Sequence, residues 1–218
     1  MANILTENQR RLLEAAGSIP FVSENFYLTG GTSLAEFYLG HRYSEDLDFF
    51  SEREIDMLNL NAAITTIRNR VRATAIDLQQ SYNRNLIFFH FGDEVVKTEF
   101  TFFPFPRIER GNVEFGVVID SIIDIAVNKL FTIYQRVRAR DFVDLYAIMR
   151  KEGFSMGDLV AKAKIKFDWQ IDPLQLGAQF MKSQEAKDYP RMTAKISPQQ
   201  WQEFFIEEAK RLKSEIIA

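Results

Sequence analysis

The stretch from Phe26 to Phe50, FYLTGGTSLAEFYLGHRYSEDLDFF, constrains the fold more than any other part of the chain. Its pattern predicts a short apolar strand at 26–28, a glycine turn, a helix, a polar loop and a second strand that opens at residue 46. Gly30 and Gly31 stand where the first strand must turn, and glycine adopts backbone angles that other residues avoid. The sequence therefore predicts a strand–turn–helix–strand unit at the centre of the fold.

Polar residues follow the turn and open the second strand. Thr32 and Ser33 stand at the predicted start of the helix, where backbone N–H groups lack partners within the helix and favour an anion. Asp46 and Asp48 are two apart on a strand, so their side chains are predicted on one face, opposite Leu47. Two adjacent carboxylates repel each other unless a cation lies between them. A phosphate-binding turn beside a carboxylate pair indicates a divalent metal ion with a nucleoside triphosphate.

Each half of this pattern also has an ordinary structural explanation. A Gly-Gly pair after a strand is often only a turn, and Asp-x-Asp at the start of a strand is often part of a solvated loop. The two halves together, with a strand and a helix in the expected places, are more specific than either half alone.

The same stretch resembles the DNA-polymerase-beta-type nucleotidyltransferases, whose signature is a Gly-Gly or Gly-Ser turn followed by Asp-x-Asp. More closely, GGTSLAEFYLGHRYSEDLDFF is similar to the AbiEii/AbiGii toxin branch, with its GGT-L opening and its GHR-S-DLDF return. Residues 128–148, NKLFTIYQRVRARDFVDLYAI, are similar to the lysine-plus-RD-x-x-D helical motif of that branch. The resemblance extends over roughly residues 26–150.

The resemblance implies an α/β (α+β) fold, with a nucleotidyltransferase core at 1–120 built on a small mixed sheet, and a helical region at 121–218 packed on that core. It implies an enzyme that uses two Mg²⁺ ions to move a nucleoside monophosphate from an NTP to an acceptor hydroxyl. It also implies a toxin of a toxin–antitoxin or abortive-infection system, with tRNA or another RNA as a possible acceptor and a cognate antitoxin as a possible partner.

A third acidic residue on a neighbouring strand is also implied by the resemblance, and Glu99 is the best-placed match. The run VVKTEFTFF at 95–103 predicts a strand with Glu99 in the middle of its mixed face. A carboxylate in so apolar a run is costly to bury without a partner, although a half-exposed strand glutamate is an equally simple explanation. The candidate metal ligands are therefore Asp46, Asp48 and Glu99.

Three further residues, Lys129, Arg42 and Asp141, are candidates for the site. Lys129 is expected to neutralise triphosphate charge, and Arg42 either contacts substrate or orders its loop. Asp141 is implied only by the resemblance and is predicted to cap a helix at 142–151. The candidate nucleotide-binding residues are Gly30, Gly31, Thr32, Ser33, Arg42 and Lys129, and the candidate catalytic residues are Asp46, Asp48, Glu99, Lys129 and Asp141.

Periodicity predicts the remaining elements. Thr6 and Gln9 form a predicted capping box, Gly17 and Pro20 end that first helix, and Asp124 is predicted to help start a later helix. Lysines at alternating positions of the 156–167 helix, including Lys166, are predicted on a solvated face. The predicted elements are helices at 6–16, 56–72, 122–136, 142–151, 156–167, 173–181 and 198–212, a hairpin at 75–91, and strands at 95–103 and 113–119.

Composition limits the class of protein. The net charge of −3 gives no overall attraction to nucleic acid, so any such binding must be local, and the RVRAR run at 136–140 favours RNA. There are no cysteines, no signal-peptide run and no segment of membrane-spanning length, which favours a cytoplasmic protein without a membrane partner. Two alternatives stay open, namely a small-molecule nucleotidyltransferase of the antibiotic-modifying kind and a non-catalytic nucleotide- or RNA-binding module.

Overall fold

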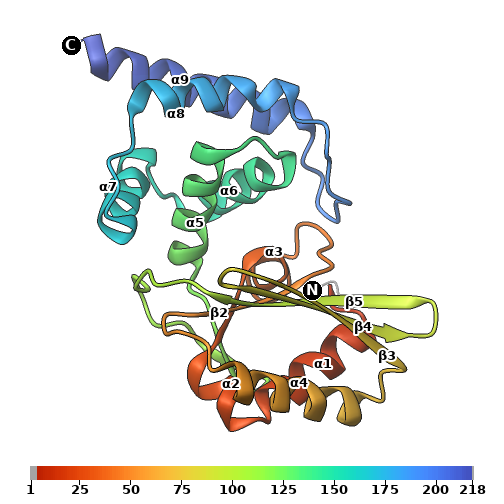
Figure 1. Ribbon diagram of the computed structural model, residues 1–218. Coiled ribbons are helices and arrows are strands. Elements are labelled where there is room, and N and C mark those ends of the chain that lie inside the picture. Colours follow the sequence, from red (N-terminus) through yellow and green to blue (C-terminus); the bar gives the residue numbers. More distant parts are fainter. Residues whose placement is uncertain (1–3, 218) are drawn as a thin grey trace. The chain divides into compact units, whose positions relative to one another are not determined.

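The computed structural model describes residues 4–217, and their side chains as far as residue 212 (Figure 1). The chain divides into two compact units, one ending at Ser121 and the other starting at Ile122. The first unit is a mixed α/β structure and the second is helical, as the sequence predicts. Within the described residues, no helix is long and apolar enough to cross a membrane.

A seven-stranded mixed sheet forms the centre of the first unit, with the strand order β3-β4-β5-β2-β1-β7-β6. β2 lies between antiparallel β1 and parallel β5, and β1 is parallel to β7. The strands are β1 (Tyr27–Thr29), β2 (Leu47–Ser51), β3 (Ala75–Ser81), β4 (Arg84–Phe91), β5 (Glu94–Phe102), β6 (Val113–Glu114) and β7 (Val117–Ile119).

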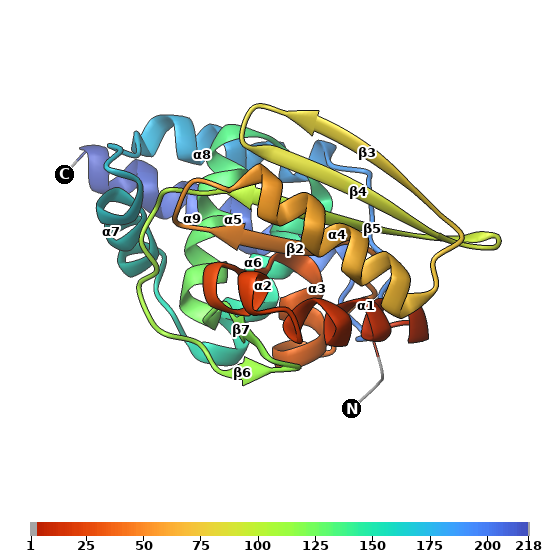
Figure 2. The same ribbon diagram turned by 60° about the horizontal axis from the view of Figure 1, so that its bottom comes forward.

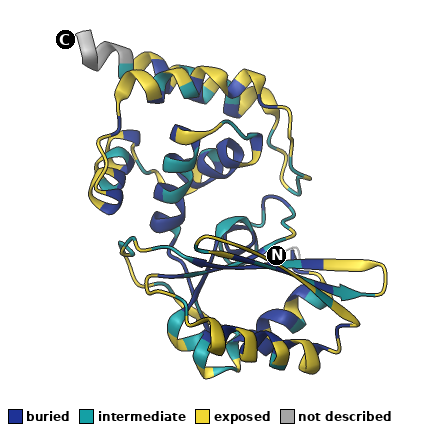
Figure 3. Ribbon diagram, in the orientation of Figure 1, coloured by how far each residue is buried: buried dark blue, intermediate teal, exposed yellow. Residues whose placement is uncertain are grey.

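Helices cover the two faces of this sheet unequally. One face carries α1 (Glu7–Gly17), α2 (Pro20–Asn25) and α4 (Met57–Val71), while α3 (Gly30–Leu34) lies on the other face (Figures 1 and 2). α3 continues directly into the π-helical turn η1 (Ala35–Leu39). The outer side of α4 is exposed and its inner side is buried (Figure 3).

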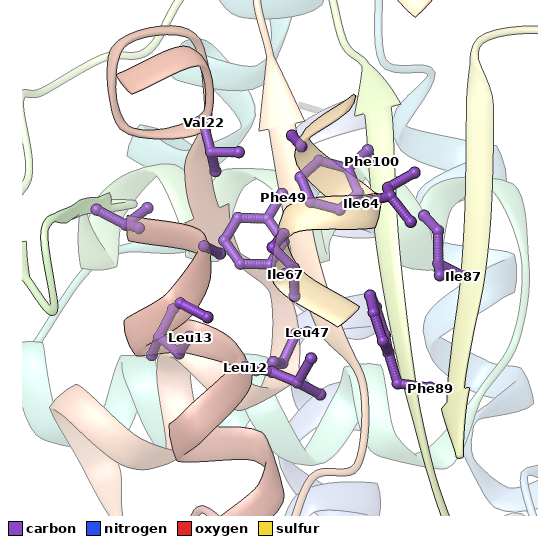
Figure 4. Packing of buried hydrophobic residues seen from close by; sticks show 14 of the residues in the cluster. Leu12, Leu13, Val22, Leu47, Phe49, Ile64, Ile67, Ile87, Phe89 and Phe100 are labelled. Carbon is purple, nitrogen blue, oxygen red and sulfur yellow. The ribbon is translucent and has the colours of Figure 1, made fainter. Parts of the chain in front are cut away.

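The main hydrophobic core lies between the sheet and helices α1, α2 and α4 (Figure 4). Leu47 and Phe49 of β2 point into it, as the alternation along the strand predicts, and the ring of Phe49 stacks on that of Phe100 with centroids 4.9 Å apart. Fully burying a side chain of this size contributes about 1.5–3 kcal/mol. The alternate positions of β2 and β5 therefore face away from this core, and Asp48 and Glu99 are among them.

Two local predictions about the first unit were wrong. Pro20 does not end a helix but begins α2, because its fixed φ suits the first helical position and no N–H is needed there. The predicted strand at 113–119 is a hairpin, because Phe115 and Gly116 both adopt positive φ and turn the chain between β6 and β7. The Thr6–Gln9 capping box at the start of α1 is confirmed.

The second unit consists of helices packed through aromatic side chains. Phe142 stacks on Trp201 with ring centroids 5.8 Å apart and makes an edge contact with Phe205 at 4.9 Å. The helices are α5 (Ile122–Gln135), α6 (Ala139–Glu152), α7 (Met156–Phe167), α8 (Pro173–Met181), the 3₁₀ turn η2 (Lys182–Glu185) and α9 (Pro198–Ile217).

Candidate active site

The glycine turn between β1 and α3 has a specific steric cause at each glycine. Gly30 has φ of 78°, and a side chain there would overlap the carboxylate of Asp48. A side chain at Gly31 would overlap the guanidinium of Arg42. The helix starts at Gly30 itself, two residues earlier than predicted. Both glycines are therefore required because an acidic and a basic side chain lie directly against the backbone of the turn.

The loop that delivers Asp46 is held from two helices. The buried side chain of Gln9 on α1 donates hydrogen bonds to the carbonyls of Ser44 and Glu45, at 3.1 and 2.9 Å. The hydroxyl of Thr32 on α3 donates to the carbonyl of Asp46. Three successive carbonyls are thus fixed by side chains, and the backbone before β2 has a defined position.

Asp48 of β2 and Glu99 of β5 lie on one face of the sheet. β2 and β5 are parallel, and Asp48 is in register with Glu99. Residues directly paired across neighbouring strands point to the same face, about 5 Å apart at their Cβ atoms. Asp48 is also in register with Thr29, at the end of the strand that leads into the glycine turn. The turn, Asp48 and Glu99 therefore follow one another across three adjacent strands.

Basic side chains pair with the carboxylates of Asp46 and Glu99. Lys97 Nζ lies 2.8 Å from Asp46 Oδ2, and both side chains are about 30% exposed. Arg84 binds Glu99 through two hydrogen bonds, from Nε to Oε1 at 2.9 Å and from Nη2 to Oε2 at 2.6 Å. The hydroxyl of Thr101 donates to Oε1 of the same carboxylate at 2.6 Å.

These contacts decide the ionisation of Glu99. Burial raises the pKa of a carboxyl group, but here the hydrogen bonds from Arg84 and Thr101 and the charges of Arg84 and Lys97 outweigh burial. The pKa of Glu99 therefore lies below its usual value, and the side chain is ionised at neutral pH. The alternative of a merely half-exposed strand glutamate does not hold, because the side chain is only 7% exposed.

The carboxylates of Asp46 and Asp48 are of the kind that divalent cations prefer, but they are not arranged as a complete metal site. Magnesium is bound by a few carboxylate oxygens together with water and substrate phosphates, and Asp46 and Asp48 supply such oxygens on one side of the sheet. Among the described residues, however, no three metal-ligating side chains are grouped closely enough to hold a metal ion. Arg84 and Lys97 now occupy carboxylate oxygens that a three-carboxylate site would use.

The polar side chains near the glycine turn differ in whether they already have hydrogen-bond partners within the protein. The Thr32 hydroxyl is engaged by Asp46, whereas Ser33 Oγ is buried and has no hydrogen-bond partner among the described residues. Arg42 is 4% exposed and donates from Nη1 to the carbonyl of Tyr43, so it orders its own loop as well as lying against Gly31.

A second polar cluster lies inside the helical unit. Lys129 Nζ on α5 lies 2.6 Å from Asp141 Oδ1 and 2.7 Å from Asp144 Oδ2, both on α6. α6 begins at Ala139, so Asp141 does not cap it as predicted but stands in its first turn. Asp144 is fully buried against Lys129. Asp141 Oδ2 is buried and has no hydrogen-bond partner among the described residues.

Arg84, Lys97 and Gln9 are parts of the site that the sequence did not indicate. Lys97 stands two residues before Glu99, so the alternation of β5 places it on the same face and was a usable signal. Arg84 and Gln9 are distant in sequence from the residues they contact, and only strand register and helix packing bring them there.

Comparison with known proteins adds independent information. The family model described as "Nucleotidyl transferase AbiEii toxin, Type IV TA system" matches residues 11–208. The chain is also 36% identical to the protein aq_aa25 of Aquifex aeolicus over 167 residues, which is 75% of this chain and 76% of that protein.

Two solved structures share the fold at low sequence identity. JHP933 from Helicobacter pylori is 20% identical, with a TM-score of 0.60 over 96% of this chain and 90% of that one. A nucleotidyltransferase candidate from H. pylori is also 20% identical, with a TM-score of 0.62 over 97% of each chain. The fold extends over nearly the whole chain, well beyond the stretch that carries the sequence resemblance.

Proposed function

Because the chain belongs to the AbiEii nucleotidyl transferase toxin family, we propose that it moves a nucleoside monophosphate from an NTP to an acceptor hydroxyl and releases pyrophosphate. The observation that carries this proposal is the order of groups across three adjacent strands. The Gly30 turn follows β1, Asp48 lies on β2, and Glu99 lies opposite Asp48 on β5.

In this proposal the glycine turn binds the phosphates of the NTP. Backbone N–H groups at the start of α3 and the side chain of Arg42 provide positive potential there, and Ser33 provides a hydroxyl without another partner. Arginine is well suited to this role because its planar donor group matches phosphate oxygens.

Asp46 and Asp48 would hold Mg²⁺, with Glu99 as the third carboxylate. When bound, Mg²⁺ neutralises phosphate charge and makes the acceptor hydroxyl a better nucleophile. Glu99 can join such a site only after giving up part of its contact with Arg84. Gln9 and Thr32 fix the backbone on which Asp46 stands, so they limit the reorganisation that binding requires.

Lys129 and Asp141 have related roles in the proposal. The ammonium of Lys129 is shared by two carboxylates, so its first effect is to hold Asp141 in place. Asp141 keeps one oxygen, Oδ2, that is able to accept a hydrogen bond or a proton from a substrate group. Because its charge is already shared by two carboxylates, Lys129 is less able to neutralise triphosphate charge than the sequence predicted.

The proposed acceptor is an RNA, and the proposed biological role is that of a toxin opposed by a cognate antitoxin. The family description names a type IV toxin–antitoxin system. If this is correct, expression of the wild-type chain alone slows bacterial growth, and Asp48→Ala or Lys129→Ala relieves the effect.

The test uses purified protein, Mg²⁺, each α-labelled NTP in turn, and total RNA or cell extract. Label is expected in an RNA species with one preferred nucleotide. Asp46→Asn should abolish Mg²⁺-dependent NTP binding in calorimetry, while Asp77→Asn, which removes a carboxylate on β3, should not. Label in a small molecule instead would indicate the antibiotic-modifying class, and binding without transfer would indicate a non-catalytic module.

A further inference from the structure

Arg84 has more donor capacity than its contact with Glu99 uses. Its Nε and Nη2 bind the carboxylate in a fork, which fixes the plane of the guanidinium. Nη1 has no hydrogen-bond partner among the described residues, and the side chain is 52% exposed, whereas that of Glu99 is 7% exposed. A rigid cation is thus presented to solvent, with N–H groups to spare, beside the candidate carboxylates.

Arg84 lies on the side of the candidate site that is away from the glycine turn. The strands β1, β2, β5 and β4 lie in this order, and they carry the glycine turn, Asp48, Glu99 and Arg84 respectively. Neighbouring strands are about 4.8 Å apart, so Arg84 stands on a strand about 10 Å from that of Asp48, on the side away from the turn. The hydrogen bond to Glu99 raises the pKa of Arg84 against the opposing effect of burial, and the charges of Glu99 and, to a smaller extent, Asp48 raise it further.

Transfer of a nucleotide requires the attacking and leaving oxygens to lie roughly in line on opposite sides of the phosphorus. If pyrophosphate leaves on the side of the glycine turn, the acceptor hydroxyl enters from the side of β5 and β4. Arg84 and Lys97 are basic residues of that flank; Lys97 is paired with Asp46, whereas Glu99 fixes the orientation of Arg84 and leaves its Nη1 exposed. An anionic group next to the acceptor hydroxyl would find charge and unused donors there, whereas a cationic acceptor would be repelled.

We propose that Arg84 is an acceptor-binding residue, which contacts the phosphodiester nearest to the attacking hydroxyl of an RNA acceptor. This inference rests on the proposed function and assigns one residue to acceptor recognition. Glu99 then has two functions, as a carboxylate of the site and as the anchor that orients Arg84. A purely structural ion pair would leave the spare donors of Arg84 without a role.

The test compares Arg84→Gln with Arg68→Gln in the full-length protein. Arg68 is an exposed arginine on α4, which covers the opposite face of the same sheet, so the two variants lose the same charge. The probe is a labelled 20-nucleotide single-stranded RNA with a free 3′ hydroxyl, whose binding is followed by anisotropy over a range of salt concentrations. Arg84→Gln should weaken binding about tenfold and reduce the salt slope by roughly 0.7, while Arg68→Gln should leave both unchanged.

A second arm modifies the RNA and leaves the protein intact. Replacing the last internucleotide phosphate by a neutral methylphosphonate should weaken binding to the wild-type protein about as much as Arg84→Gln does. It should have little further effect on that variant, and Arg84→Lys should lose affinity while keeping the salt slope. If Arg84→Gln folds poorly, the methylphosphonate RNA is compared between the wild-type protein and Arg84→Lys instead.

Three outcomes overturn the proposal in distinguishable ways. Equal RNA affinity for wild type, Arg84→Gln and Arg68→Gln would show that the arginine only stabilises the sheet. A loss of NTP affinity with unchanged RNA affinity would place the residue on the nucleotide instead. If the wild-type protein neither binds RNA nor transfers nucleotide to it, the RNA acceptor of the proposed function fails, and this role fails with it.

Discussion

Helix α5 contributes to two ion-pair clusters that contain the same residue types but have different properties. Near the start of the helix, Asp124 pairs with Lys166 of α7 at 2.6 Å, and the two side chains are 0% and 1% exposed. Five residues later, Lys129 is 12% exposed and faces two carboxylates, one of which keeps an oxygen without a partner. The first cluster is closed to solvent, which is typical of a structural pair. The second includes a lysine that solvent reaches and a buried carboxylate oxygen without a hydrogen-bond partner among the described residues, which is typical of a functional cluster.

This comparison corrects one prediction. Lys166 was predicted to lie on a solvated face, whereas it is buried against Asp124, which stands in the first turn of α5. Burying two ions is costly, and their attraction repays the cost only when the contact is close and well hydrogen-bonded. The pair therefore links α5 to α7, and removing either partner alone should be strongly destabilising.

The largest expected effect is a loss of stability when the buried pair of Asp124 and Lys166 is broken. Asp124→Asn removes the carboxylate from a buried lysine and should lower the free energy of unfolding by about 3–5 kcal/mol. Urea unfolding followed by circular dichroism measures this loss. The double variant Asp124→Leu/Lys166→Met should recover most of it, since an apolar pair needs no charge compensation. A single variant as stable as wild type would show that the pair contributes little.

The same kind of substitution in the cluster of Lys129, Asp141 and Asp144 should reduce activity with little effect on stability. Asp141→Asn leaves Lys129 paired with Asp144, so the free energy of unfolding should change by no more than about 1 kcal/mol. Nucleotide transfer should fall by about 100-fold or more if Asp141 Oδ2 accepts a proton or hydrogen bond. Stability and transfer are measured on the same preparation. A large loss of stability with unchanged transfer would reverse the assignment of the two clusters.

The ion pair between Arg84 and Glu99 is intermediate in exposure and should have an intermediate, pH-dependent effect. The pKa of Glu99 is lowered in the folded protein, so its contribution is present above the unfolded pKa of about 4.3 and is lost as the pH falls through the lower folded value. Because Arg84 is half exposed, Glu99→Gln should cost only about 1 kcal/mol at pH 7. The difference from wild type should shrink below about pH 4. A difference that is constant from pH 7 to pH 3 would contradict this account.

Substitutions of Thr6, which caps α1, and of Gln9 in its first turn should cause similar losses of stability but different losses of ligand binding. Thr6→Ala removes the helix cap and should cost about 1 kcal/mol, and Gln9→Leu should cost about 1 kcal/mol because it removes two part-buried hydrogen bonds to the loop. Only Gln9→Leu, which releases the loop before Asp46, should also weaken Mg²⁺-dependent NTP binding. Calorimetry on both variants tests this, and equal losses of affinity would show that Gln9 acts through helix stability alone.

Local patterns determined much of this protein. Alternation of apolar and polar residues was enough to predict the inward side of β2 and β5, because side chains on a strand alternate between faces. Helical spacing and capping residues were enough for α1, α4 and the helices of the second unit. The glycine pair and Asp-x-Asp also indicated the family, since each motif has a specific steric or electrostatic cause.

Tertiary structure decided which charges meet. Pairing of Arg84 with Glu99 depends on the register of β4 against β5, and pairing of Lys166 with Asp124 depends on the packing of α7 against α5. Neither contact has a signal in local periodicity, because an isolated lysine or arginine is equally compatible with solvent. The sequence by itself therefore predicted the faces of β2 and β5 that carry Asp48 and Glu99, and only the folded chain selected the cations that bind carboxylates, since burial removes water as the competing partner.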